Sequence, residues 1–513
     1  MDDKESPNKS TSLKKELSFL EIFIAGVVGA VGTGVLFSTA GMAGYAGPSL
    51  IISWIIGALF YTFIAIPIIE LSLVWPEAGG PARYPLYTHG NTLNLLSSFM
   101  NLVWYLFIPP IEALATVEGL AYFFPKLLVP NSTIPTPLGA IVGTILLLLF
   151  VPFNYYGVKV FGKSTLGLGI FKLILYIVAA LSISFVFFSA KNFTSLPGGF
   201  IPYGFTGIFY AIPLAMFAYG GIRVIPDFAE EVKDKNFLGK AIILVVIGQT
   251  IIYILFSIVF VGGIKWDSFG FKPGDWTSIS NLPGNPFVDI SSAIHSNISL
   301  FLILIVAILG PFVTGYIYLG GGTRVVFAMA RSGYMPEKLK EVSETYAIPY
   351  WSLIVFAIIG AILTFLTAPI HAIYSLLEDA VVGGYLAFAT LPVAMLSARR
   401  KGLTPNNYRL PVGWLWSGLA FISASLIAFW SGWPSVPYAI AIGIIASIVF
   451  GFIFKVKGDF KKSIWYVVYL IFILIMTYIG SDGALNIIGF IPSTIIVAIV
   501  SVFIFLPWGV LSS

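Results

Sequence analysis

Long apolar runs recur along the whole chain, separated by short stretches of polar residues, glycine and proline. A helix needs about 20 mostly apolar residues to cross a bilayer. The pattern therefore predicts an all-α polytopic membrane protein with about fourteen spans, at 18–45, 49–74, 97–124, 137–155, 166–190, 205–230, 238–264, 297–330, 350–369, 373–397, 411–431, 436–455, 464–480 and 486–508. Only Ala368-Pro369-Ile370-His371 separates the ninth span from the tenth, so that boundary is the least distinct.

The composition agrees with this class. The chain has 513 residues, of which 58% are hydrophobic and 10% charged, and its mean hydropathy is +0.95. A soluble protein of this size could not bury so much apolar surface. The absence of cysteine excludes disulfides and thiolate metal sites. The net charge of +5 is better explained by membrane orientation than by nucleic-acid binding.

The distribution of basic residues predicts the orientation. If the polar tail at 1–17 is cytoplasmic, 21 of the 28 Lys and Arg residues lie on the cytoplasmic side. Only four then lie outside, at Lys126, Lys191, Lys265 and Lys272. This asymmetry follows the positive-inside rule. It predicts a multi-pass protein of the cell membrane with both termini in the cytoplasm. The longest outer connection, about 265–296, is expected to be a solvated loop with its two tryptophans at the interface, or alternatively a helical cap over an outer vestibule.

Two spans carry interruptions that a continuous helix would not favour. Gly29, Gly32 and Gly34 fall within six residues of the first span, and the sixth span contains Phe-Ala-Tyr-Gly-Gly-Ile at 217–222. Each glycine costs a helix about 1 kcal/mol relative to alanine. A broken membrane helix exposes N–H groups on one half and C=O groups on the other, and these suit a zwitterion. The alternative is close helix packing through small residues.

Six separated motifs, in the same order along the chain, resemble the amino acid–polyamine–organocation (APC) superfamily of transporters. They are GTGVLF at 32–37, ELSLVWPEAGGPARY at 70–84, PIEA at 110–113, NYYGVK at 154–159 with FKL at 171–173, FAEEVK at 228–233, and TRVVFAMARSGYMP at 323–336. The resemblance implies a leucine-transporter-like fold of two inverted five-helix repeats with discontinuous helices 1 and 6. It divides the chain into the tail at 1–17, a transport core at 18–400 and four C-terminal helices at 401–513.

The resemblance also assigns roles at the two breaks. It implies that the substrate carboxylate meets Gly32, Thr33 and Gly34. This agrees with the positive dipole end of the outer half of the first span. The substrate ammonium would meet carbonyl groups, for which the resemblance implies Ala30 beside the first break and Phe217, Ala218 and Gly220 at the second. Phe217 is also expected to be an aromatic lid, or alternatively a packing ring.

Lys172 lies in the middle of the fifth span, where a charge is expensive. Burial disfavours the charged form of an amine, which suits a group that takes up and releases a proton. By resemblance, a lysine here replaces a sodium ion in proton-coupled relatives. Lys172 is therefore expected to couple transport to protons. The alternative is a lysine that extends to the membrane interface or stays permanently paired.

Arg223 follows the second break and stays charged, so it needs a partner. One hypothesis pairs it with Asp227 or Glu112. The other places an anionic substrate side chain against it, which would disfavour cationic substrates. Tyr219 and Glu112 complete, with Phe217 and Arg223, the expected side-chain pocket or gate. At the cytoplasmic ends, ion pairs could form an inner gate from Glu70, Arg83, Arg324, Arg331, Glu230 and Glu231, or merely a surface network.

Enzymatic chemistry has little support. The three histidines, His89, His295 and His371, are far apart without metal-ligand spacing, and no phosphate-binding GxxxxGK motif occurs. No cofactor or metal is expected. The sequence predicts a secondary active transporter for amino acid uptake, coupled to protons and working by alternating access in the lipid bilayer. Two alternatives stay open: an amino acid or polyamine exchanger of the same fold, and an amino-acid sensor that binds without transporting.

Overall fold

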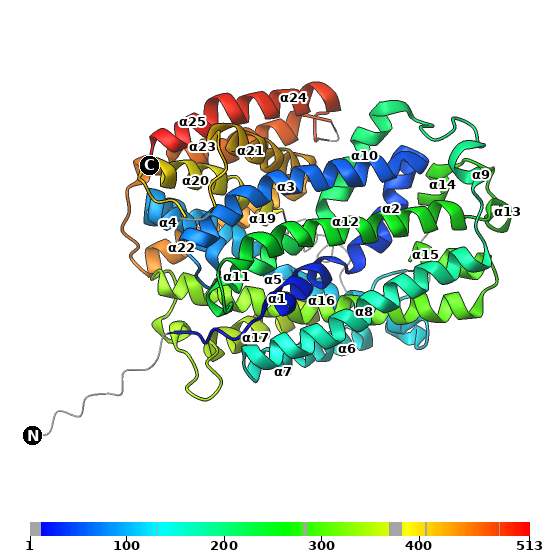
Figure 1. The fold of residues 1–513 in the computed structure, drawn as a ribbon, viewed down its shortest axis with the longest axis horizontal. Coiled ribbons are helices and arrows are strands. Elements are labelled where there is room, and N and C mark those ends of the chain that lie inside the picture. Colours follow the sequence, from blue (N-terminus) through cyan, green and yellow to red (C-terminus); the bar gives the residue numbers. More distant parts are fainter. Residues whose placement is uncertain (1–11, 131, 281–284, 369–381, 406–407, 482) are drawn as a thin grey trace, which may run out of the picture.

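The computed structural model describes residues 12–513 apart from 131, 281–284, 369–381, 406–407 and 482 (Figure 1). In this part the chain is helical, with two isolated β-bridges. Eleven helices of the described chain are long and apolar enough to cross a membrane, which makes this a polytopic membrane protein. Two further apolar helices, Phe19–Ala30 and Ile464–Ile479, are shorter.

The first half of the chain runs through α1 to α12. The helices are α1 (Phe19–Ala30), α2 (Thr33–Ala46), α3 (Leu50–Val74), α4 (Tyr84–His89), α5 (Asn91–Ala121), α6 (Pro137–Leu149), α7 (Val151–Tyr155), α8 (Val158–Val186), α9 (Lys191–Thr194), α10 (Gly204–Ala218), α11 (Val224–Asp227) and α12 (Phe237–Gly263). Short 3-10 turns join several of them, including η4 (Gly220–Arg223) and η5 (Ala229–Glu231).

The second half begins with three short helices and then forms the remaining spans. These are α13 (Trp266–Phe269), α14 (Trp276–Ser280), α15 (Pro286–Ala293), α16 (Asn297–Arg331), α17 (Tyr350–Thr367), α19 (Gly383–Phe388), α20 (Thr390–Arg400), α21 (Gly413–Trp430), α22 (Ser435–Ile453), α23 (Ile464–Ile479), α24 (Phe490–Val500) and α25 (Leu506–Leu511). A π-turn at Ser501–Phe505 joins α24 to α25 as one span.

The expected count of fourteen exceeds the eleven long helices for identifiable reasons. The run Gly34–Val74 contains both α2 and α3, and α1 and α23 are shorter than a full span. The predicted boundary between the ninth and tenth spans, at 368–371, is confirmed as the end of the ninth span, because α17 ends at Thr367. Residues 369–381, the start of the predicted tenth span, lie outside the described residues, and α19 and α20 follow them.

The two interrupted spans pack against each other. α2 lies along α10, while α1 packs against η4 and α11 (Figure 1). α5, α8 and α16 flank this pair, with α5 and α16 in extensive contact. Among the C-terminal helices, α21 packs on α3 and α20, and α22 packs on α5. The interrupted helices are therefore enclosed by continuous ones, which is where irregular membrane backbone is tolerated.

The described part of the outer connection is helical, which agrees with the alternative of a helical cap rather than with a solvated loop. It forms α13, α14 and α15, and α14 and α15 pack against α2. Trp266 and Trp276 are 6% and 0% exposed and lie edge to face, with ring centroids 5.0 Å apart. The expectation that they lie at the membrane interface is therefore wrong. They form a small core that holds this segment over the end of α2.

Candidate substrate site

Both glycine-rich stretches are breaks in helices. α1 ends at Ala30, and Gly32, with φ −115° and ψ −138°, is the N-cap of α2. α10 ends at Ala218 and changes to the 3-10 turn η4. A Cβ atom on Gly34 would lie 3.6 Å from the Cβ of Ala218, so the start of α2 meets the end of α10. This brings together a helix end rich in N–H groups and one rich in C=O groups.

The expected substrate-backbone residues lie around this junction. Gly32 and Gly34 are at the start of α2, and Ala30, Ala218 and Gly220 are at the ends that face it. Thr33 and Phe217 belong to α2 and α10, but their side chains are outside the described part of the chain, so the lid role of Phe217 stays a prediction.

The hydroxyl of Tyr253 in α12 contacts both breaks, and Tyr253 is not among the residues expected from the sequence. Its hydroxyl lies 2.6 Å from the carbonyl oxygen of Ala218 and 3.2 Å from that of Ala30. These are two of the carbonyl groups expected to accept hydrogen bonds from a substrate ammonium. No local signal marks Tyr253, because it is one of 25 tyrosines and lies in an apolar run.

Tyr219, expected in the side-chain pocket or gate, is fully buried and directed elsewhere. Its hydroxyl lies 3.0 Å from the carbonyl oxygen of Trp54 and 3.0 Å from Thr250 Oγ1. It therefore attaches the second break to α3 and α12. Its neighbour Gly220 has little room, since a Cβ atom there would lie 3.0 Å from the ring of Trp104.

The Lys172 ammonium is buried where α1, α8 and α16 meet. It donates to the carbonyl oxygens of Val28 and Gly310, both at 2.8 Å, and to Thr314 Oγ1 at 2.9 Å. Its exposure is 0%, so the alternative that it extends to the membrane interface is wrong. Val28 is in the last turn of α1, where the helix dipole favours a cation. Thr314 is a further site residue that the sequence did not single out.

Glu112 lies on the other side of Gly32. A Cβ atom on Gly32 would be 3.2 Å from Glu112 Oε1 and 2.9 Å from Thr314 Oγ1. The Glu112 carboxylate is 7% exposed and close enough to Lys172 to interact with it electrostatically. The structure thus groups Glu112 with Lys172 and the first break, rather than with Arg223.

Arg223 is held by neutral groups. Its Nη1 donates to Asn101 Oδ1 at 2.7 Å, and its Nη2 donates to the carbonyl oxygen of Gly384. The guanidinium carbon lies 3.8 Å from the ring centroid of Phe388 and 4.5 Å from that of Trp104. Trp104 also borders Gly220, so the guanidinium is next to the second break.

The expected ion pair of Arg223 with Asp227 or Glu112 is not formed among the described residues. Asp227 instead accepts a hydrogen bond from the hydroxyl of Tyr105 through Oδ2. Arg223 does not reach these carboxylates because its side chain extends from the end of η4 toward α5 and α19, where Asn101 and Gly384 lie. The cationic head of Arg223 is thus buried and forms no ion pair in this part of the chain, although Asp227 is close enough to interact with it electrostatically.

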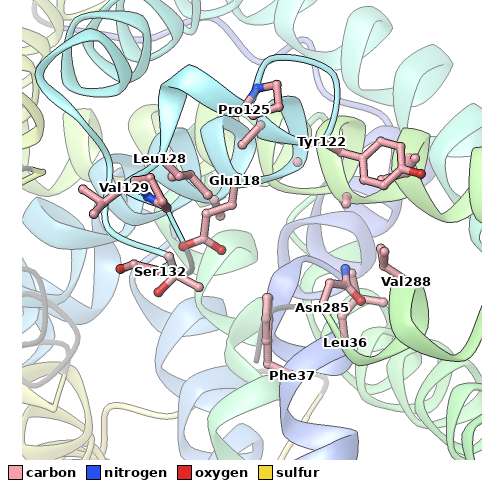
Figure 2. Close-up of a pocket in the computed structure, with 17 residues that line it drawn as sticks. Leu36, Phe37, Glu118, Tyr122, Pro125, Leu128, Val129, Ser132, Asn285 and Val288 are labelled. Carbon is pink, nitrogen blue, oxygen red and sulfur yellow. The ribbon is translucent and has the colours of Figure 1, made fainter. Parts of the chain in front are cut away.

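A cavity of about 420 Å³ lies just beyond the first break, beside the first half of α2 (Figure 2). Leu36 and Phe37 of α2 form one side, and Glu118 and Tyr122 lie opposite, with Asn285 and Val288 beside them. The lining is mostly apolar. The cavity also reaches Ala307 in the first half of α16.

The opposite end of α16 carries ion pairs. Arg324 makes two hydrogen bonds to Glu231, of 2.7 and 2.8 Å, and Arg331 makes two to Glu230, of 2.6 and 3.0 Å. Seventeen residues separate Ala307 from Arg324, which is about 25 Å along a helix. The cavity and the ion pairs therefore lie at opposite ends of the molecule.

The three acidic residues of the expected inner gate or surface network, Glu70, Glu230 and Glu231, all form ion pairs. Glu70 pairs with Arg399, at 2.6 and 2.5 Å, while Arg83 pairs with Glu77 at 3.0 Å. Partial burial opposes ionisation of Glu230, but Arg331 outweighs it and lowers the pKa of that carboxyl below its usual value. Glu77 and Arg399 are partners that the sequence analysis did not name.

The described end of the N-terminal tail crosses this ion-paired region. Leu17 N–H and Glu16 N–H both donate to the carbonyl oxygen of Glu231 at 2.9 Å, and Lys233 N–H donates to that of Leu17. Leu13 N–H donates to Glu230 Oε1 at 3.4 Å. Residues 13–17 thus form a strap across the segment that carries Glu230 and Glu231.

Fold and site together define a class: a polytopic helical membrane protein with two broken helices facing each other across a polar centre. Comparison with known sequences gives the family. Residues 17–454 match the family model for amino acid permeases, so the chain belongs to the amino acid permease family. This confirms the resemblance to the APC transporters.

Two relatives from Bacillus subtilis (strain 168) match almost end to end. The chain is 32% identical over 511 residues to the aspartate-proton symporter, covering 97% of this chain and 96% of the relative. It is 29% identical over 540 residues to the glutamate/serine transporter AimA, covering 98% and 94%. The branched-chain amino acid permease BcaP is 27% identical over 369 residues, covering 69% and 75%. These are transporters and not enzymes.

Proposed function

We propose that this protein is a proton-coupled symporter that takes up acidic amino acids across the cell membrane by alternating access. The buried guanidinium of Arg223 carries the substrate assignment. It is next to the second break and forms no ion pair among the described residues, where its hydrogen bonds go to neutral oxygens. A buried cation is stabilised most by an anion that forms hydrogen bonds with it. The side-chain carboxylate of aspartate or glutamate supplies that anion.

The two breaks bind the part common to all amino acids. The N–H groups at Gly32, Thr33 and Gly34 receive the α-carboxylate, and the carbonyl groups at Ala30, Phe217, Ala218 and Gly220 receive the ammonium. The contact between Gly34 and Ala218 supports this division. The names of the two full-length relatives agree with an acidic substrate.

Lys172 carries the proton. Its ammonium holds α1 to α16 through Val28, Gly310 and Thr314. Losing the proton removes at least one of these hydrogen bonds and the charge that favours the C-terminal end of α1. The inner half of the first span is then free to move, and the ion pairs of Glu230 and Glu231 separate as the inner side opens. The transport core is 18–400, residues 401–513 are accessory helices, and both termini are cytoplasmic.

The substrate assignment is tested in proteoliposomes with an inward pH gradient. Uptake of labelled aspartate should be inhibited by unlabelled aspartate and glutamate and much less by leucine or lysine. Arg223→Gln should reduce aspartate uptake at least tenfold, because an amide cannot replace a paired guanidinium. Arg409→Gln, at an exposed position, is the matched control. Equal inhibition by leucine in the unaltered protein would exclude the acidic side-chain site.

The coupling assignment is tested with Lys172→Met. This variant should lose accumulation driven by the pH gradient but keep exchange of labelled for unlabelled aspartate across the membrane. Lys163→Met, an exposed lysine on the same helix α8, should behave like the unaltered protein. Full accumulation by Lys172→Met would disprove the role. A sensor would bind aspartate without accumulating it, and an exchanger would need amino acid on the far side.

A further inference from the structure

A group of basic side chains gathers at the ion-paired end of the C-terminal helices, away from the substrate site. Arg400 and Lys401 end α20, and Lys462 precedes α23. We call these three residues the basic triad. Four more basic residues follow Lys401 in the sequence, at Arg409, Lys455, Lys457 and Lys461, and the chain beyond Arg400 has no glutamate and only Asp459 and Asp482.

Two members of the basic triad are held in place by contacts to backbone carbonyl groups, and Lys462 is close enough to Lys401 to interact with it electrostatically. Arg400 Nη1 donates to the carbonyl oxygen of Val510 at 3.2 Å, and Lys401 Nζ donates to that of Thr88 at 2.5 Å. His89, next to Thr88, contacts the carbonyl oxygen of Gly509 at 2.9 Å. Segments from α4, α20 and α25 thus converge on one place (Figure 1).

Nothing in the described chain neutralises these charges. None of the three residues takes part in an ion pair there, and the neighbouring Arg399 is already paired with Glu70. Partial burial and the nearby charges of Lys462 and Arg400 lower the pKa of Lys401 below its ordinary value. Three like charges near one another create a positive potential that attracts an anion.

Exposed apolar side chains lie close in sequence to the triad and to the Val510 carbonyl that Arg400 contacts. Phe460, between Asp459 and Lys461, is 57% exposed, Leu511 is 71% exposed and Leu403 is 41% exposed. The connection 454–463 is attached to the start of α5, where Asn91 Nδ2 donates to the carbonyl oxygen of Lys457 at 2.8 Å. Basic and exposed apolar residues together match the two parts of a phospholipid, its phosphate and its acyl chains.

We infer that Arg400, Lys401 and Lys462 form a binding site for the headgroup of an anionic phospholipid, which holds the C-terminal helices against α4 and α20. A free phosphate offers the same charge but no acyl chains to cover Phe460 and Leu511. The lipid therefore satisfies both features of the surface. The site does not depend on which amino acid is transported.

The test uses the full-length protein in neutral detergent. Phosphatidylglycerol should raise its thermal unfolding midpoint by several degrees relative to phosphatidylcholine, and native mass spectrometry should detect bound phosphatidylglycerol. The triple variant Arg400→Gln, Lys401→Gln, Lys462→Gln should lose at least half of that shift and one bound lipid. The matched control changes three exposed basic residues of the opposite side, Lys126→Gln, Lys191→Gln and Lys272→Gln.

A second variant distinguishes an effect of removing the positive charges from an effect of disturbing the fold. Arg400→Lys, Lys401→Arg, Lys462→Arg keeps all three charges and should restore lipid binding. An equal shift with inorganic phosphate alone would overturn the lipid assignment in favour of a free anion. An unchanged phosphatidylglycerol shift in the Gln variant, or an equal loss in the control, would overturn the site itself.

Discussion

A guanidinium stays charged at any pH a cell experiences, so a buried arginine needs groups that replace its lost water. Around Arg223 these groups are one amide oxygen, one carbonyl oxygen and two aromatic faces. Such groups stabilise a cation only partly. The guanidinium lies beside the second break, where our proposal places the anionic side chain of the substrate.

Tyr253 leads to a prediction about ligand binding. Tyr253→Phe removes the hydroxyl that contacts the carbonyl oxygens of Ala218 and Ala30. Leaving buried acceptors unpaired costs about 1–3 kcal/mol, so the ligand-free protein should unfold at a lower temperature. A bound amino acid brings an ammonium to the same acceptors. The thermal shift caused by aspartate should therefore be larger in the variant than in the unaltered protein.

The control for this prediction is Tyr176→Phe, whose hydroxyl contacts the carbonyl oxygen of Gly32 at 3.3 Å. Gly32 belongs to the expected carboxylate end, so this variant should not gain in ligand-induced shift. A smaller aspartate shift in Tyr253→Phe would mean that the hydroxyl takes part in binding rather than occupying the place of the ammonium.

Single residues differ in how far the sequence could identify them. Lys172 and Arg223 are visible because a charge within an apolar run is costly and rare. Thr314 and Tyr253 are not, because neutral hydroxyl residues are common in membrane helices and their partners are distant in sequence. The proposed partner of Arg223 was wrong for a related reason: sequence spacing gives the distance between two positions but not the direction in which each side chain leaves the helix.

At the scale of elements, both breaks could be predicted from glycine content, but their enclosure could not. Glycine lowers the cost of leaving a helix, and this is a local property. Packing of α2 along α10 depends on the whole bundle. The helices α13–α15 could be expected only as an alternative to a loop, because each is four to eight residues long, too short to give a periodic pattern.

The strap at 13–17 is an element whose removal has a defined consequence. It adds backbone hydrogen bonds to Glu231 and a contact to Glu230, next to the pairs with Arg324 and Arg331. Deleting residues 2–17 should therefore make the ion-paired end open more often. Because the chain has no cysteine, a single Ala78→Cys substitution at this buried position reports opening through its rate of maleimide labelling. We expect labelling to be several-fold faster after the deletion.

Deleting residues 2–11 alone is the control, because it leaves the strap and the Ser18 cap of α1 in place. Labelling at Ala78→Cys should then stay as in the full chain. Equal rates in the long and short deletions would show that the strap does not hold this end closed. A rate that also rises when aspartate is added to the full chain would connect opening with transport.

At the scale of the whole molecule, the two ends of the bundle are different. One end has a cavity bordered by α2, α5 and α15, and the other has ion pairs, the strap and the basic triad. Composition and the positive-inside rule anticipate a charged end and an apolar body. They do not indicate that one end is hollow, since a cavity arises from how side chains pack.

His89 gives the last prediction, because it attaches the C-terminal helix to the ion-paired end. It is 1% exposed, and its Nε2–H donates to the carbonyl oxygen of Gly509 while Nδ1 accepts from Thr88 Oγ1. Burial, together with the charges of Lys401 and Lys462, lowers the pKa of His89 to about 4 from 6.5. At a pH between these two pKa values, the imidazole of His89 is protonated in the unfolded chain but neutral in the folded chain. Stability should therefore fall as the pH drops from about 6.5 toward 4, by up to about 3 kcal/mol from this residue alone.

Replacing the imidazole of His89 measures how much of the loss of stability at low pH comes from this residue. His89→Gln can still donate to Gly509 but cannot be protonated, so its thermal unfolding midpoint should decrease less between pH 7 and pH 5 than that of the unaltered protein. His295→Gln changes an exposed histidine and should leave the pH dependence as it is. If His89→Gln and the unaltered protein lose the same number of degrees, protonation of other groups governs the acid sensitivity. The contact between α4 and α25 would then be no weaker in acid than at neutral pH.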